Sequence, residues 1–126
     1  MAKSEQKKLS GIEKHFGSYK YSVRGVWLAF YYEHNMRYHL AAAIGVVLVN
    51  YLLKISRTEW VITLILIGLA WMAEVFNTAL EKLADRVNQH PDPLIGQAKD
   101  LASGAVFIIC LFAVICALII YLPYLL

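Results

Sequence analysis

Three acidic residues and one amide, at helical spacing, are the part of this chain best suited to chemistry. They are Glu74, Asn77, Glu81 and Asp85. On an α-helix the three carboxylates fall within about 40° of one another, and the amide lies about 60° away. One helix face therefore carries all four groups. Carboxylate and amide oxygens suit a hard cation such as Mg²⁺, and a partly buried carboxylate suits general-base work because desolvation raises its pKa.

The helix that carries these groups begins as an apolar run. Residues 60–73 contain no charged residue, and no turn residue separates them from Glu74. A membrane span needs about 20 residues, so a span that enters at Trp60 leaves near Leu80. Glu74 then lies within the hydrocarbon, where an ionisable group is costly unless it is paired, solvated or protonated. The alternative, a polar helix end that snorkels to water, suits Asp85 but not Glu74, because glutamate is too short to cross two helical turns.

The composition indicates a membrane protein with a single domain. The chain has 126 residues, of which 60% are apolar, and its mean hydropathy is +0.55. Residues 1–11 are polar and lysine-rich, so we expect no signal peptide. The small net charge of +3 favours contact with a membrane surface over binding of nucleic acid. Cys110 and Cys116 lie six residues apart in an apolar run, which predicts two small buried side chains rather than a disulfide or a metal site.

Periodicity predicts an all-α integral membrane protein with one surface helix and three transmembrane helices. The apolar residues between 11 and 32 recur every three or four positions, with Lys14 and Lys20 off that stripe, which is typical of an amphipathic surface helix. Ser56 to Glu59 fits a capping box, and Asp92 followed by Pro93 fits a helix start. The predicted segments are a tail at 1–10, a surface helix at 11–34 and spans at 38–55, 59–81 and 101–122.

The charges predict the orientation of these segments. Most lysines and arginines lie in the tail, the surface helix and the 82–100 segment, and only Lys54 and Arg57 lie in the opposite turn. Positively charged segments stay in the cytoplasm, so the N-terminus is expected inside and the C-terminus outside. The polar residues then gather at the cytoplasmic boundary of the membrane, and they are Glu33, Glu74, Asn77, Glu81, Lys99 and Asp100.

Carboxylates, an amide and a lysine at a cytosolic membrane boundary suit a magnesium–nucleotide complex. Magnesium is often bound by one or two carboxylates together with phosphate oxygens, and lysine binds phosphate as a point charge. A lipid alcohol would present its hydroxyl at the same depth. The pattern therefore predicts phosphoryl transfer from ATP to a lipid, although the chain has neither a P-loop nor a kinase glycine-rich loop. His34 and His39 are interpreted as interface histidines.

Two sequence motifs together resemble the signature of the prokaryotic diacylglycerol kinase family. The first is Glu74-x-x-Asn77-Thr78-Ala79-Leu80-Glu81-x-x-x-Asp85, and the second is Ala98-Lys99-Asp100-x-x-x-Gly104-Ala105-Val106. The resemblance runs from about Phe16 to the end of the chain. An earlier motif, Glu33-x-Asn35-x-Arg37-x-His39, is similar to the undecaprenol kinase branch of that family.

The resemblance implies a small kinase of the bacterial inner membrane that forms a homotrimer with active sites between subunits. It implies ATP as co-substrate, Mg²⁺ as cofactor and undecaprenol or diacylglycerol as the lipid. By position, Glu74 matches the catalytic base that takes the lipid hydroxyl proton, and Glu33 and Glu81 match the magnesium ligands. Ser103 falls in the lipid-contacting region. The positions that match nucleotide contacts are Lys14, Tyr21, Asn77, His90, Asp92, Lys99 and Asp100.

Two other classes of function fit these residues less well than a kinase. In a transporter, Glu74 would carry a proton or cation across the bilayer. A transport pathway needs polar groups at the midplane and beyond, whereas the carboxylates of this chain gather at one side of the membrane. In a non-catalytic assembly subunit, Glu74 and the Lys99–Asp100 pair would have no role. The residues alone leave the choice of lipid open, because apolar contacts discriminate poorly between chains.

Overall fold

The computed structural model describes residues 11–126, and this part of the chain is helical without any β-strand. The helices are α1 (Gly11–Tyr32), α2 (His34–Leu53), α3 (Arg57–Val87) and α4 (Pro93–Leu125). The all-α prediction is confirmed. The tail predicted at 1–10 lies outside the described residues.

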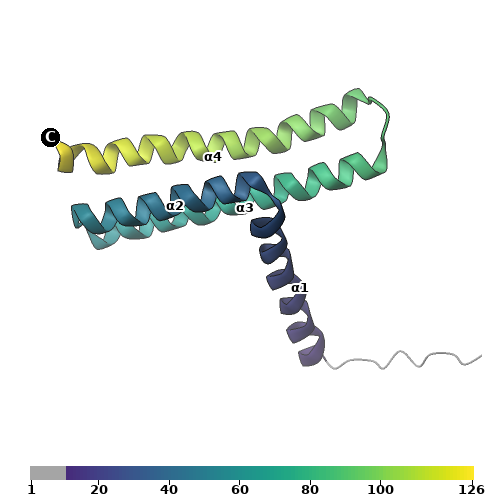
Figure 1. Ribbon diagram of the computed structural model, residues 1–126, viewed down its shortest axis with the longest axis horizontal. Helices are drawn as coiled ribbons and strands as arrows, with labels where there is room; N and C mark the ends of the chain where they lie inside the picture. The colour runs from purple at the N-terminus through teal and green to yellow at the C-terminus, as the bar shows by residue number, and fades with distance from the viewer. Residues whose placement is uncertain (1–10) are drawn as a thin grey trace, which may run out of the picture.

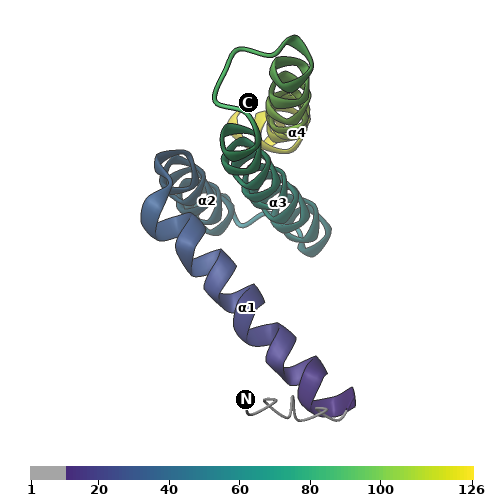
Figure 2. The ribbon, with the colours of Figure 1, turned by 90° about the vertical axis from the view of Figure 1, so that its right-hand side faces the viewer.

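Three helices form a bundle, and α1 points away from it. In Figure 1, α2, α3 and α4 lie side by side with nearly parallel axes, and α1 departs from them at a steep angle. Figure 2 shows the same departure from a second direction, with α1 running away from the bundle on the side of α2 and α3. A helix that leaves a membrane bundle in this way is suited to lie along the membrane surface, as predicted for residues 11–34.

The three bundled helices are long and apolar enough to cross a membrane. The predicted spans fall on them, although α2 begins four residues before the expected start and ends at Leu53. With 31 and 33 residues, α3 and α4 measure about 46 and 50 Å at 1.5 Å per residue. A bilayer core is about 30 Å thick, so both helices extend well beyond it. The joined ends of α3 and α4, around residues 82–100, are therefore free to lie in water.

Local sequence explains where three of the helices begin and end. The capping box is confirmed: the Ser56 backbone N–H donates to Glu59 Oε2 at 2.8 Å, and the Glu59 N–H donates to Ser56 Oγ at 3.3 Å. The helix start at 92–93 is also confirmed, because Asp92 Oδ1 accepts from the Leu94 N–H at 2.9 Å and Pro93 occupies the first turn. Lys54 ends α2 in the left-handed region, with φ of 53°.

A polar network that the sequence did not predict joins the three spans at the end away from Glu74. Asn50 is fully buried, and its Nδ2 donates to Thr63 Oγ1 at 2.8 Å. The Tyr121 hydroxyl donates to Asn50 Oδ1 at 2.5 Å. Polar groups at membrane depth must find partners inside the protein, so the network ties α2 to both α3 and α4.

Removing one hydroxyl tests how much this network stabilises the bundle. Tyr121→Phe keeps the ring and deletes the donor to Asn50, so we expect the free energy of unfolding to fall by about 1 kcal/mol. Tyr51→Phe is the matched control, because Tyr51 is 75% exposed and should change stability by less than about 0.5 kcal/mol. Both are measured by denaturant titration in mixed micelles. Equal stabilities of the two variants would show that the network contributes nothing measurable.

Candidate active site

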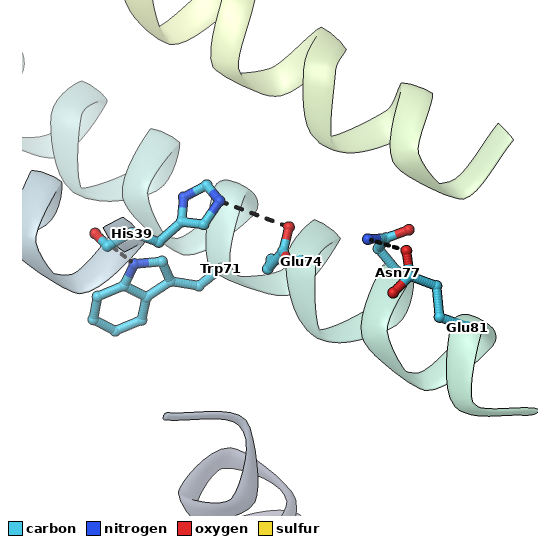
Figure 3. Close-up of polar contacts among 5 residues, drawn as sticks. All are labelled: His39, Trp71, Glu74, Asn77 and Glu81. Carbon is cyan, nitrogen blue, oxygen red and sulfur yellow. Dashed lines mark hydrogen bonds and ion pairs between the residues drawn. The ribbon is translucent and has the colours of Figure 1, made fainter. Parts of the chain in front are cut away.

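Glu74 is a buried carboxylate on the middle of α3, facing the space between the helices. Only 3% of its surface is exposed. His39 approaches from α2, and its Nε2 lies 3.7 Å from Glu74 Oε2, as Figure 3 shows. This distance is too long for a direct hydrogen bond but short enough for an ion pair when the imidazole is protonated. The arrangement supplies a desolvated carboxylate with one titratable partner.

Trp71 fixes the position of His39 along the axis of α3, relative to Glu74. Its indole Nε1 donates to the backbone carbonyl of His39 at 3.4 Å, which joins α3 to α2 (Figure 3). The Trp71 ring also packs edge-on against Phe30 of α1, with ring centroids 4.9 Å apart. One side chain thus holds three helices together one turn from Glu74.

Asn77 and Glu81 continue the polar face of α3 towards its C-terminal end. Asn77 Nδ2 donates to Glu81 Oε1 at 3.4 Å, drawn as a dashed line in Figure 3. Asn77 is only 6% exposed, and its Oδ1 is buried without a hydrogen-bond partner. Leaving a buried acceptor unpaired costs about 1–3 kcal/mol, so such an atom is a candidate for ligand contact. The carboxamide and carboxylate oxygens are the hard donors that Mg²⁺ takes.

Glu33 links the junction of α1 and α2 to the same end of α3. It is the N-cap residue of α2, and its Oε1 lies 2.8 Å from Lys82 Nζ. The hydrogen bond and charge of Glu33 raise the pKa of Lys82, which lies beyond the apolar span at 59–81. Lys82 follows Glu81 in sequence. This ion pair therefore brings Glu33 and Glu81, the two predicted magnesium ligands, to a similar position along the axis of α3. In the described part of the chain, however, no three carboxylate, histidine or cysteine side chains converge as a ready metal site.

The turn between α3 and α4 forms an open cavity of about 620 Å³ with a mixed polar and apolar lining. Lys99 Nζ binds Asp85 Oδ1 at 2.6 Å across this cavity, and the contact raises the pKa of Lys99, which precedes the apolar span at 101–122. The cavity is large enough for a small ligand. Its lining includes three of the predicted nucleotide-contacting residues, namely His90, Asp92 and Lys99.

Comparison with known proteins assigns the chain to a family. The family of prokaryotic diacylglycerol kinases matches residues 20–121. The chain belongs to that family. It is therefore a membrane lipid kinase with ATP as co-substrate, and the transporter and assembly-subunit alternatives are set aside.

Three relatives each cover three quarters or more of this lipid kinase. An undecaprenol kinase of Bacillus subtilis is 36% identical over 112 residues, which span 89% of this chain and 91% of the relative. A diacylglycerol kinase of Pseudomonas aeruginosa is 32% identical over 108 residues, 86% of this chain and 88% of the relative. A diacylglycerol kinase of Escherichia coli K12 is 30% identical over 95 residues, which span 75% of this chain and 78% of the relative.

Four residues predicted for the site of this lipid kinase do not reach Glu74 within one chain. Lys14 and Tyr21 lie on exposed positions of α1, and Tyr21 is 70% exposed. Asp100 and Ser103 are exposed on α4. None of the four forms a hydrogen bond or ion pair with Glu74, Asn77 or Glu81 within residues 11–126.

Two neighbours of the predicted base were missed by sequence reasoning. His39 was interpreted as an interface histidine, and Trp71 as part of an apolar run. In the structure His39 lies beside the Glu74 carboxylate, and Trp71 donates a hydrogen bond to the backbone carbonyl of His39. A signal for His39 was present, because it ends the polar motif that begins at Glu33. No pattern within α3 points to Trp71, since its partner lies on another helix.

Proposed function

We propose that this kinase transfers the γ-phosphate of ATP to the hydroxyl of undecaprenol at the cytoplasmic face of the bacterial inner membrane. The observation that carries the proposal is Glu74, a buried carboxylate on a helix long and apolar enough to cross a membrane, with His39 beside it and the unpaired Oδ1 of Asn77 one turn away. Undecaprenol is favoured over diacylglycerol by the higher identity to the undecaprenol kinase and by the motif that ends at His39.

In the proposed reaction Glu74 accepts the proton of the lipid hydroxyl as the oxygen attacks the γ-phosphorus. Transfer is direct and in line, without a covalent phospho-enzyme. A carboxylate held in place by the packing around it is suited to this step because a general base must lie within hydrogen-bond reach of the hydroxyl whose proton it takes. His39, whose Nε2 lies 3.7 Å from Glu74 Oε2, is placed to orient the carboxylate.

The same end of α3 is proposed to hold the nucleotide and its metal ion. Glu33, Glu81 and the free Oδ1 of Asn77 fit Mg²⁺ because all are hard oxygen donors. When bound, Mg²⁺ neutralises charge on the phosphate oxygens. Lys99 supplies a further positive charge at the turn cavity. The other proposed nucleotide contacts are Lys14, Tyr21, His90, Asp92 and Asp100.

We propose that the site is completed by a second copy of the chain in a homotrimer. The exposed positions of Lys14, Tyr21, Asp100 and Ser103 support sharing, because in one chain they lie away from Glu74. The excess of lysine and arginine at the end that carries Glu33 and the turn at 88–92 supports a cytoplasmic position for that end. The C-terminus of α4 then lies outside.

Parallel phosphorylation of two lipids tests the proposal. Purified protein in mixed micelles is given ATP and Mg²⁺ with undecaprenol or with diacylglycerol, and labelled product is quantified. We expect kcat/KM for undecaprenol to exceed that for diacylglycerol by about tenfold or more. A preference for diacylglycerol would keep the active site but overturn the choice of lipid. Absence of both products from folded protein would overturn the assigned catalytic roles.

A further inference from the structure

The proton that Glu74 accepts in each turnover has to leave the protein before the next turnover. Only 3% of Glu74 is exposed, so the carboxylate itself has little contact with water. Within residues 11–126 it has one ion-pair partner, His39, and no hydrogen-bond partner. A carboxylic acid that stays protonated cannot act as a base again. Repeated turnover therefore needs a route by which this proton reaches water.

His39 lies between Glu74 and a more open part of the protein. Its Nε2 is 3.7 Å from Glu74 Oε2, and its side chain is 19% exposed. Figure 3 shows one ring nitrogen turned towards the carboxylate and the other turned away from it. Imidazole takes up and releases a proton near neutral pH more readily than other side chains. A ring in this position can accept a proton at one nitrogen and release one from the other.

An open hollow of about 370 Å³ is lined by both members of the pair, Glu74 from α3 and His39 from α2. Asn35 also lines it. Residues four apart share one face of a helix, so Asn35 lies one turn before His39 on the same face of α2. That turn is the start of α2, where α1 joins the bundle. The hollow thus reaches from the carboxylate past the imidazole to the end of α2 that meets the surface helix.

The other groups around the pair do not compete for the proton. Tyr38 of α2 and Cys110 of α4 line the hollow, but phenols and thiols ordinarily keep their own proton at neutral pH. His39 also lines an apolar cavity of about 240 Å³ between α2, α3 and α4. The hydroxyls on that wall, Thr63 and Tyr121, belong to the polar network described above. No further charged side chain lines either space, and α1 lines neither.

We propose that His39 is a proton relay, which carries the proton from Glu74 to water after each phosphoryl transfer. The O–H bond of the Glu74 carboxylic acid breaks, an N–H bond forms at His39 Nε2, and the carboxylate is restored. Water then takes the proton from Nδ1 of the imidazolium, and exchange with solvent restores the starting tautomer. Direct transfer needs the two atoms about 0.5–1 Å closer than in the structure, which a side-chain movement supplies. The inference rests on the proposed function, because it takes Glu74 as the base.

Glutamine at position 39 separates a relay from a group that only orients the carboxylate. Its amide nitrogen donates a hydrogen bond, so it can hold Glu74 in place, but it cannot take up a proton and pass it on. The bond from Trp71 Nε1 goes to the backbone carbonyl of His39 and does not depend on the side chain. The contact between α2 and α3 is therefore kept in His39→Gln.

The test compares the first turnover with the later ones. Protein in mixed micelles with undecaprenol is mixed rapidly with labelled ATP and Mg²⁺, and product is quantified over time. We expect His39→Gln to form about one product per site at a rate within about threefold of the parent protein, and then to slow about tenfold or more. Equal slowing of all turnovers, or no slowing, would overturn the relay. His34→Gln is the matched control, because His34 is exposed on α2 and lies outside the wall of the hollow.

A second measurement adds free imidazole to the His39→Ala protein. The hollow is open, and the shorter side chain leaves room for the added ring. Imidazole should raise the steady-state rate about threefold or more and leave the first turnover unchanged. No rise, or an equal rise in the first turnover, would overturn the relay. Failure of the proposed function is seen separately: if Glu74 is not the base, Glu74→Gln keeps its first turnover.

Discussion

Glu74→Gln should reduce the rate of lipid phosphorylation by about a thousandfold while ATP affinity stays within about twofold of the parent protein. The substitution keeps the size and buried position of the side chain and removes its ability to accept the hydroxyl proton. ATP is proposed to bind further along α3 and at the turn, so its contacts remain. The measurements are kcat in mixed micelles and equilibrium binding of a labelled nucleotide. Loss of ATP affinity with turnover retained would contradict the assignment of Glu74 as base.

Glu59→Gln provides the matched control for this experiment. Glu59 lies on the same helix at the opposite end of the span, where it caps α3 and accepts a hydrogen bond from the Tyr124 hydroxyl at 2.6 Å. Glutamine also serves in a capping box, so the helix start is kept. Turnover within about threefold of the parent protein is expected, because Glu59 is remote from the proposed chemistry. A large loss in both variants would indicate that any lost carboxylate on α3 damages the fold.

Glu81→Ala should raise the Mg²⁺ concentration needed for half-maximal rate by about tenfold or more. The reason is that Glu81 is a proposed ligand and is also the hydrogen-bond partner of Asn77, at 3.4 Å. Its removal takes away one oxygen donor and leaves the Asn77 amide without its partner. Glu81→Asp keeps the charge and should recover part of the metal affinity. The measurement is a Mg²⁺ titration of the rate at saturating ATP.

The Glu59→Gln protein also serves as control for the titration. It should respond to Mg²⁺ as the parent protein does, because its changed side chain lies at the other end of α3. An unchanged magnesium curve for Glu81→Ala would remove Glu81 from the metal site. In that case Glu33 and the unpaired Oδ1 of Asn77 would be the remaining donors on this face of the protein.

The sequence by itself determined the helices and their polar face. The caps at Ser56 and Asp92 depend on residues within three positions, so local chemistry was enough to place the starts of α3 and α4. The length of an apolar run predicts how far a helix has entered the bilayer, and on this ground alone Glu74 is predicted at membrane depth. Helical periodicity then placed Asn77 and Glu81 on the same side of α3.

Only the tertiary structure decided which side chains of the other helices lie against the polar face of α3. His39 meets Glu74 across 35 positions of sequence, and Tyr121 meets Asn50 across 71. Such contacts depend on the rotation and offset of one helix against another, which the packing of all side chains sets together. A periodic pattern in one helix shows which face is polar and does not show what the face meets. The pairing of Glu33 with Lys82 and the apolar cavity between α2, α3 and α4 were therefore visible only once these helices were assembled.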